Sequence, residues 1–235
     1  MSYLFADSTA AISFADVPEL DITTNYTISY WVKLNSATLS VVPLRKGSNY
    51  GAYFEYGFGG RVTNLFTKTG TTGAYRAYSD TTAHMGTFVG GWHHIVMRGS
   101  AGTPNSVWID GVDRTEGSNI YWFADTQDLT QPLYLGNQAA LNAAIDGYLA
   151  EVAIWNSEYI TDGAVTQLMG LESPMLLSSP PDWYVRLKDN AIEHISSAVG
   201  TVSLATQNAD HPAVDPPTGG GGGGGGRANR SFGIL

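Results

Sequence analysis

Few side chains of this protein could carry catalysis, and they are far apart in the sequence. Glu151 lies in an alternating segment, where its same-face neighbours two positions away are Leu149 and Ala153. Retaining glycoside hydrolysis needs a second carboxyl group about 5 Å from the first. Because this segment offers no second acid on the face of Glu151, hydrolysis by a carboxylate pair is not expected. We predict that the protein is not an enzyme.

Two adjacent histidines, His93 and His94, are the other candidates for a general base or a metal ligand. Neighbouring residues of a strand point to opposite faces, so the pair cannot readily chelate one ion. We interpret them as the start of a strand, with one histidine packed and the other exposed. The sequence has no cysteine, which excludes disulfides, zinc thiolate sites and thiol nucleophiles.

Aspartates in predicted loops raise the question of calcium. Asp110, Asp113 and Asp146 are the candidate ligands, because calcium takes several carboxylate and carbonyl oxygens. They form no contiguous loop motif and would have to converge in space. Aspartate also favours turns on its own account, which is the alternative interpretation. We predict no cofactor, and keep calcium as the one candidate ion.

Aromatic side chains are the candidates for carbohydrate binding, since sugar rings stack on exposed aromatic faces while nearby amides bond the hydroxyls. Trp108 and Tyr134 are predicted to lie on the face of their strands opposite the apolar residues. Tyr121 and Trp122 belong to an aromatic run between polar residues, and Asn137 supplies an amide. For each of these residues the alternative is a place in the core or at a subunit interface.

Strand patterns with turn residues between them recur along the chain. In residues 27–34 the even-numbered positions are apolar and predict one buried face. In residues 148–155 the even-numbered positions, Tyr148, Ala150, Val152 and Ile154, are predicted to share one face. Asp110-Gly111 is a two-residue hairpin signal. Residues 36–90 predict strands whose register the pattern does not fix.

One short helix is expected after these strands. Thr161 can cap it, Ala164, Val165 and Leu168 form an apolar stripe, and Gly170 can end it. Strands alternating with turns, and a single short helix, predict an all-β antiparallel sandwich of two sheets.

The bulk composition excludes several classes of function. The chain has 235 residues, of which 12 are basic and 21 acidic, for a net charge of −9. This balance argues against nucleic acid as a partner, because phosphate binding needs a basic surface. No apolar run is long enough to cross a membrane. The first cationic side chain is Lys33, so a signal peptide is not expected and the protein should remain in the cytoplasm that makes it.

Four segments, in this order, resemble the strand motifs of laminin G-like domains: Asn25 to Val32, Trp92 to Val96, Val107 to Gly111 and Gly147 to Asn156. The resemblance covers residues 1–172 and implies a concanavalin A-like jelly roll. Such domains include lectins, adhesins, glucanases and structural modules, so the resemblance implies a fold and does not define a ligand. It also implies that binding at a surface is more expected than catalysis.

We divide the chain into three parts. Residues 1–172 form the laminin G-like sandwich, residues 173–215 add strands that close it or pack on it, and residues 216–235 form an extended tail. The tail holds eight consecutive glycines, which cannot fold alone because glycine loses the most backbone entropy. Its tip is basic and apolar, with Arg227, Arg230, Phe232, Ile234 and Leu235.

Two functions from different classes fit these features. The first is a non-catalytic structural or decoration protein of a bacteriophage virion, released by lysis, whose tail docks on other virion subunits or on copies of itself. The later stretch, with Trp183-Tyr184 and then Asp210 to Val214, resembles a continuation found in laminin G-like proteins of bacteriophages and marine bacteria. The second is a lectin-like module that recognises cell-surface glycans. A decorating subunit could also bind glycans.

The tail hypothesis makes a direct prediction. If the tip docks on a neighbouring copy, the full-length protein oligomerises and a version that ends at Asp215 stays monomeric. Light scattering measures both masses in solution. Equal masses would contradict docking between copies of this chain.

Overall fold

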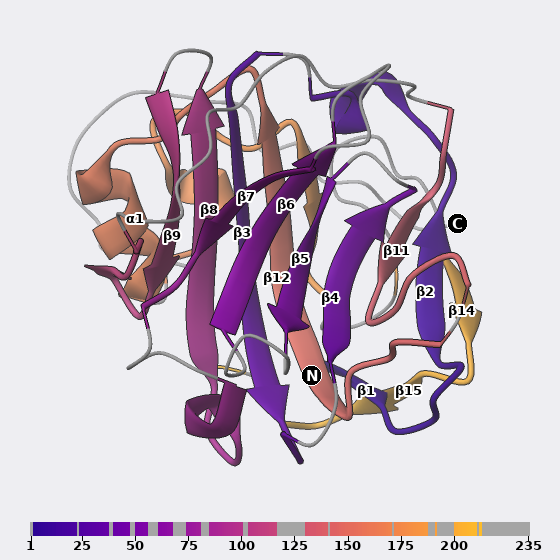
Figure 1. The fold of residues 1–235 in the computed structure, drawn as a ribbon. Helices are drawn as coiled ribbons and strands as arrows, with labels where there is room; N and C mark the ends of the chain where they lie inside the picture. The colour runs from indigo at the N-terminus through magenta and orange to yellow at the C-terminus, as the bar shows by residue number, and fades with distance from the viewer. Residues whose placement is uncertain are drawn as a thin grey trace, which may run out of the picture.

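Two antiparallel β-sheets stack face to face in the protein (Figure 1). The computed structural model describes residues 2–22, 24–37, 40–47, 50–55, 61–67, 74–80, 85–100, 103–116, 130–140, 142–170, 172–187, 191, 200–210 and 212. Within these residues lie one α-helix, α1 (Asp162–Met169), and three short 3-10 helices, η1 (Pro18–Leu20), η3 (Met85–Phe88) and η5 (Pro174–Leu176). No described helix is long and apolar enough to cross a membrane.

The first sheet has eight described strands, in the order β10-β9-β8-β3-β12-β1-β15, with β13 paired to the other half of β12. Their bounds are β1 (Ser2–Phe5), β3 (Tyr26–Leu34), β8 (His93–Ser100), β9 (Thr103–Ile109), β10 (Val112–Asp113), β12 (Gly147–Asn156), β13 (Trp183–Val185) and β15 (Thr206–Asn208).

The second sheet has seven described strands, in the order β14-β2-β11-β4-β5-β6-β7. Their bounds are β2 (Ala11–Phe14), β4 (Val41–Lys46), β5 (Tyr50–Glu55), β6 (Arg61–Thr67), β7 (Ala74–Tyr78), β11 (Leu133–Leu135) and β14 (Thr201–Ser203). In Figure 1, β4 to β7 lie in front of the first sheet. The expected all-β two-sheet sandwich is confirmed.

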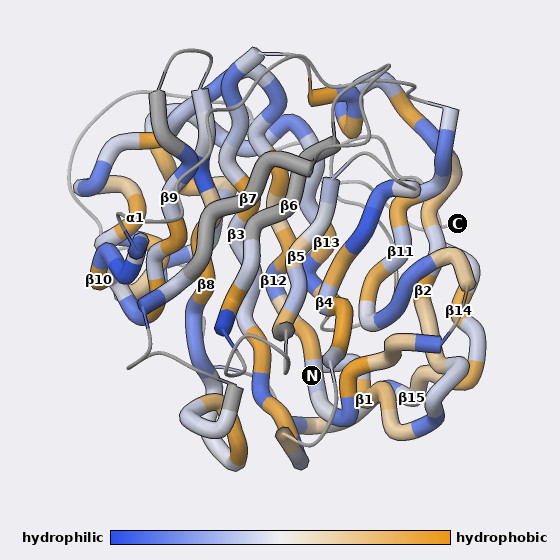
Figure 2. Tube along the Cα trace, viewed as in Figure 1, coloured by the Kyte–Doolittle hydropathy of each residue, from blue (hydrophilic) through white to orange (hydrophobic). Residues whose placement is uncertain are grey.

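The main core fills the space between the sheets. The even-numbered residues of β3, from Tyr26 to Leu34, all belong to it, which confirms the alternation expected there. Phe14 of the second sheet meets the edge of Trp183 of the first, with ring centroids 5.0 Å apart. Hydrophobic segments accordingly run along the strands that line this space, such as β11 and β12 (Figure 2).

The expected alternation of β12 is wrong, because a β-bulge interrupts it. The register against β3 shifts between Ala150 and Ala153, and Glu151 has a φ of 52°. An extra residue in one strand reverses the phase of all that follows. Tyr148 and Ala150 therefore lie on the outer face, whereas Val152 and Ile154 belong to the main core.

The bulge residue is a buried carboxylate with two partners. Tyr184 Oη donates a hydrogen bond to Glu151, and Arg186 Nε lies 3.2 Å from Glu151 Oε1. Burial and the nearby carboxylate raise the pKa of Tyr184. The acid that the sequence singled out is therefore engaged in holding the strand that follows Pro181 to β12.

Helix α1 packs on part of the outer face of the first sheet. Ala164 N donates to Thr161 Oγ1 at 3.2 Å, which confirms the expected cap, and the helix ends at Gly170. Val165 and Leu168 pack there in a second apolar cluster with Val96, Trp155 and Tyr184, among others. The bulge places Trp155 on this outer side.

The segment after residue 172 contributes strands to both sheets. β13 and β15 pair with β12 and β1 in the first sheet, and β14 pairs with β2 in the second. Asp210 anchors the end of this segment, because its carboxylate accepts from Lys33 Nζ at 2.5 Å and from Trp92 Nε1 at 3.1 Å. Its backbone carbonyl accepts from Ser2 Oγ.

We predict that Glu151→Gln lowers the free energy of unfolding by about 2 kcal/mol, since it leaves a largely buried guanidinium without its counter-charge. For a chain of this size the melting temperature should fall by about 4–8 °C. Thermal unfolding measures the change, and Glu172→Gln, at an exposed position, is the matched control. An unchanged melting temperature for Glu151→Gln would show that the ion pair adds nothing to stability.

Candidate functional site

The predicted carbohydrate-binding residues fall on different faces of the sandwich. Trp108 lies on the outer face of the first sheet and is part of the cluster under α1. The guanidinium of Arg98 covers its ring at 4.7 Å from the centroid. Tyr134 lies on the outer face of the second sheet, while Tyr121 and Trp122 lie outside the described residues. These residues therefore do not assemble into one described site.

Asn137 is a structural residue and is not placed to bind a sugar, contrary to the prediction. It is fully buried. Its Nδ2 donates to the carbonyls of Ser8 and Ala10, at 3.2 and 3.1 Å. Its Oδ1 accepts from the backbone N–H groups of Gln138 and Ala143. The amide thus joins two loops and has nothing left to offer a ligand.

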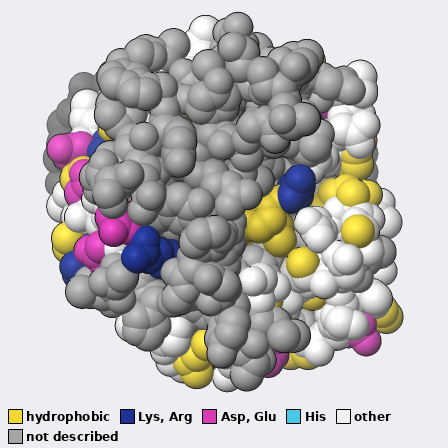
Figure 3. Space-filling model, in the orientation of Figure 1, with side chains coloured by type: hydrophobic (Ala, Val, Ile, Leu, Met, Phe, Trp, Pro, Cys, Tyr) yellow, Lys and Arg dark blue, Asp and Glu magenta, His cyan; other side chains and the backbone are white. Residues whose placement is uncertain are grey.

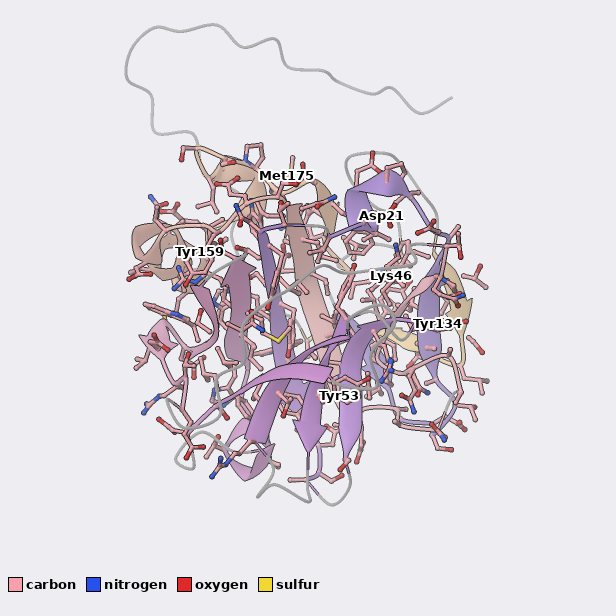
Figure 4. The ribbon with its side chains drawn as sticks, turned by 45° about the horizontal axis from the view of Figure 1, so that its top comes forward. Asp21, Lys46, Tyr53, Tyr134, Tyr159 and Met175 are labelled. Atoms are coloured by element: carbon pink, nitrogen blue, oxygen red, sulfur yellow. The ribbon has the colours of Figure 1, made fainter. Side chains whose placement is uncertain are left out.

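A row of three outward side chains crosses the second sheet: Tyr134 of β11, Arg45 of β4 and Tyr53 of β5. Tyr134 and Arg45 are directly opposite each other in the strand register, and Arg45 is opposite Gly51. All three are half-buried. We call them the aromatic row, and Figure 4 shows Tyr134 and Tyr53 on their two strands. An apolar patch beside a cationic side chain is visible over this part of the sheet in Figure 3.

Gly51 lets the ring of Tyr53 lie close to the sheet. A Cβ atom at Gly51 would be 3.1 Å from Tyr53 Cε2 and 2.9 Å from the carbonyl oxygen of Leu44. The contact with the carbonyl oxygen is closer than Cβ atoms tolerate, and the contact with the ring would require Tyr53 to shift by a few tenths of an ångström. The ring leans toward Arg45, whose guanidinium carbon lies 5.1 Å from its centroid.

Three polar atoms on this face of β5 and β6 are buried without a hydrogen-bond partner: Tyr53 Oη, Thr63 Oγ1 and Arg61 Nε. Tyr53 and Thr63 are opposite each other in the register, and Arg61 shares the face of Thr63 two residues away. Buried polar groups are nearly always bonded, so unpaired ones call for a specific explanation. Because the three atoms have almost no accessible surface, a ligand on this face could bond them only if the side chains around them moved.

Sequence reasoning found Tyr134 but missed Arg45 and Tyr53. Both lie in residues 36–90, where the register was not assigned. The usable signal was local, because Arg45 follows the core residue Leu44 and Tyr53 precedes the core residue Phe54. That signal gives the face of each side chain but not which strands are neighbours.

The aspartates predicted as calcium ligands each have partners of their own. Asp110 accepts from His93 Nδ1 at 2.7 Å and from the backbone N–H of His94 at 2.9 Å. Asp113 accepts from the backbone N–H and hydroxyl of Thr115. Asp146 accepts from the side chains of Asn35 and Ser36. In the described part of the chain no group of three His, Asp or Glu residues could hold a metal ion.

Ser29, His94 and Asp110 are near one another but are not arranged as a catalytic triad. Ser29 Oγ lies 2.8 Å from His94 Nε2. The other ring nitrogen of His94 is buried without a partner, and Asp110 bonds the neighbouring His93. A triad needs its acid on the second nitrogen of the same imidazole. His94 is instead packed against Trp31, with ring centroids 5.0 Å apart.

The fold and these contacts define an antiparallel jelly-roll sandwich. A sequence model of laminin G type, described as the concanavalin A-like lectin/glucanases superfamily, matches residues 6–161. The chain belongs to this superfamily. Among curated proteins, none matches the sequence.

Solved structures with this fold include three whose names mention carbohydrate binding or a bound oligosaccharide. A Bacteroides ovatus protein, provisionally named as carbohydrate binding, has a TM-score of 0.64 at 13% identity, over 91% of this chain and 61% of that one. Domain 4 of a Geobacillus stearothermophilus arabinanase, in complex with arabinotriose, has a TM-score of 0.51 at 20% identity over 68% and 72%. A carbohydrate-binding domain of a Ruminococcus gnavus sialidase, bound to α2,3-sialyllactose, has a TM-score of 0.51 at 13% identity over 67% and 92%.

At these identities the similarity shows the fold alone. The chain also spans only 61% of the length of the Bacteroides ovatus protein and 43% of the mouse laminin α1 fragment that it matches. The ligands named with these structures are therefore properties of those proteins.

We predict that His94 makes the fold sensitive to mild acid. Burial lowers the pKa of His94 to about 4, against the opposing effect of the Asp110 carboxylate. The unfolded chain, with an ordinary histidine pKa of about 6.5, binds this proton more readily. Stability should therefore fall by about 3 kcal/mol as the pH drops from about 6.5 to about 4. Urea unfolding across this range measures the loss.

The variant His94→Gln keeps a hydrogen-bonding group near Ser29 but does not titrate. Its stability should be lower than that of the wild type at pH 7 and should change much less between pH 6.5 and 4. A wild-type stability that is flat over this range would contradict the assignment.

Proposed function

We propose that the protein is a non-catalytic carbohydrate-binding module whose ligand lies across the aromatic row on the outer face of the second sheet. The observation that carries the proposal is the row itself. The row places the rings of two tyrosines and the guanidinium of Arg45 on three adjacent strands of the sheet.

Each part of this face matches a need of sugar recognition. The apolar side of a pyranose or furanose ring stacks on an aromatic face, as Tyr134 and Tyr53 can provide. Sugar hydroxyl groups need hydrogen-bonding groups that are not already paired, as the two terminal nitrogens of Arg45 can provide, since only its Nε is bonded to the described chain. Strands also hold side chains more rigidly than loops, which reduces the entropy lost on binding.

The similar structures support this proposal over the alternatives. Three of them are named with carbohydrate binding or with a bound oligosaccharide. The absence of catalysis is part of the proposal and is supported by Glu151, whose carboxylate is occupied by Tyr184 and Arg186.

The virion role expected from the sequence has less support. It depends on the tail, whose residues Arg227, Arg230, Phe232, Ile234 and Leu235 lie outside the described part of the chain. None of the similar structures reported above is a virion protein. Docking of the tail on other subunits stays a prediction, and so does calcium binding through Asp110, Asp113 and Asp146.

We predict that Tyr134→Ala weakens oligosaccharide binding by about tenfold or more, because a stacking surface for the sugar is lost. A glycan array followed by calorimetry, with arabinotriose and 3′-sialyllactose among the probes, measures the effect with and without EDTA. Tyr148→Ala is the matched control, since Tyr148 is a half-buried tyrosine on the outer face of the opposite sheet. It should bind as the wild type does.

Two results would contradict the proposal. Wild-type protein that binds no glycan, with or without calcium, would exclude carbohydrate binding. Binding that Tyr148→Ala abolishes and Tyr134→Ala leaves intact would place the site on the first sheet.

A further inference from the structure

Arg45 differs from every other cationic side chain that the structure describes. Each of the others has a carboxylate within 4 Å. The pairs are Lys33 with Asp210, Lys46 with Asp16 and Asp21, Arg61 with Glu116, Arg98 with Asp162, Arg114 with Asp80, and Arg186 with Glu151. Arg45 has no such partner among the described residues, although acids outnumber bases in the sequence by 21 to 12.

The missing partner is unfavourable where Arg45 lies. The side chain is half-buried, and this burial lowers its pKa with no carboxylate to offset the effect. A cation that loses water without gaining a counter-charge is destabilised. An anion bound beside Arg45 would relieve this cost.

The guanidinium is also held in a fixed orientation. Its Nε donates to the carbonyl oxygen of Gly47, and its Cζ lies over the ring of Tyr53, 5.1 Å from the centroid. The two terminal nitrogens make no hydrogen bond to the described chain. Two parallel N–H groups of this kind match the two oxygens of a carboxylate. The pre-arranged fork favours a planar carboxylate over a hydroxyl group.

We propose that the ligand of the aromatic row is an acidic glycan, in which a sugar carboxylate binds Arg45 while the same or the next ring stacks on Tyr134. This inference rests on the proposed carbohydrate-binding function and adds the class of sugar. A uronic acid and a sialic acid both present such a carboxylate. Arg45 is the residue that selects it.

The test uses ligands that differ only in charge. Calorimetry with the full-length protein compares trigalacturonic acid with its methyl ester, and 3′-sialyllactose with lactose. At least one acid should bind roughly tenfold more tightly than its neutral counterpart, or better, which is the range of a charge-assisted pair of hydrogen bonds. The acid that binds identifies the source of the carboxylate.

Three variants assign the preference to Arg45. Arg45→Gln should weaken binding of the preferred acid roughly 10-fold to 100-fold. Its affinity for the neutral counterpart should stay within about threefold of the wild-type value. Arg45→Lys keeps the charge but loses the fork, so its affinity for the acid should be intermediate. Arg114→Gln removes the same charge from the edge of the first sheet and should change neither ligand. Melting temperatures confirm that each variant is folded.

The outcomes separate this inference from the function on which it rests. Equal affinities for acid and ester, with binding still lost in Tyr134→Ala, would overturn the acidic glycan and leave the carbohydrate-binding module standing. A preference for acid that Arg45→Gln does not reduce would overturn the role of Arg45. If the wild type binds none of the four ligands and no glycan on the array, both proposals are overturned.

Discussion

The rest of the structure depends on one strand, β12, and on the bulge at Glu151 that divides it. Before the bulge, β12 pairs with β1 and β3; after it, with β13 and β3. The reversed phase sends Leu149, Val152 and Ile154 into the main core and Ala153 and Trp155 toward α1. A single strand thus supplies both the inter-sheet core and the floor of the helix-covered cluster. The buried carboxylate keeps the bulge in place through Tyr184 and Arg186.

The outer faces of the two sheets differ as a result. Part of the first sheet is covered by α1 and the segment that follows it, and the large side chains there, such as Trp155 and Arg98, are buried. The second sheet keeps half-buried aromatic and cationic side chains on its outside. Arg45 and Tyr134 are almost 90 positions apart in sequence, yet they are direct neighbours because β4 and β11 pair. The site is therefore a product of strand order.

The sequence was sufficient for the fold class, for the alternation of β3, for the cap and end of α1, and for the outward position of Tyr134. It was insufficient at the bulge, because three of the four odd positions in residues 148–155, Leu149, Ala153 and Trp155, are apolar, as all four even positions are. It was also insufficient for Asn137, whose burial depends on contacts with Ser8 and Ala10 far away in the chain. Arg45 and Tyr53 were missed since pairing between distant strands leaves no local pattern.

The last described strands have a consequence for biosynthesis. β14 and β15 cover the outer edges of β2 and β1, which are made first. Until residues 201–208 leave the ribosome, both sheets present an open edge whose backbone groups can pair with another chain. Both sheets are therefore completed only after residues 201–208 have been synthesised, and until then the nascent chain exposes unpaired strand edges, which are prone to aggregation.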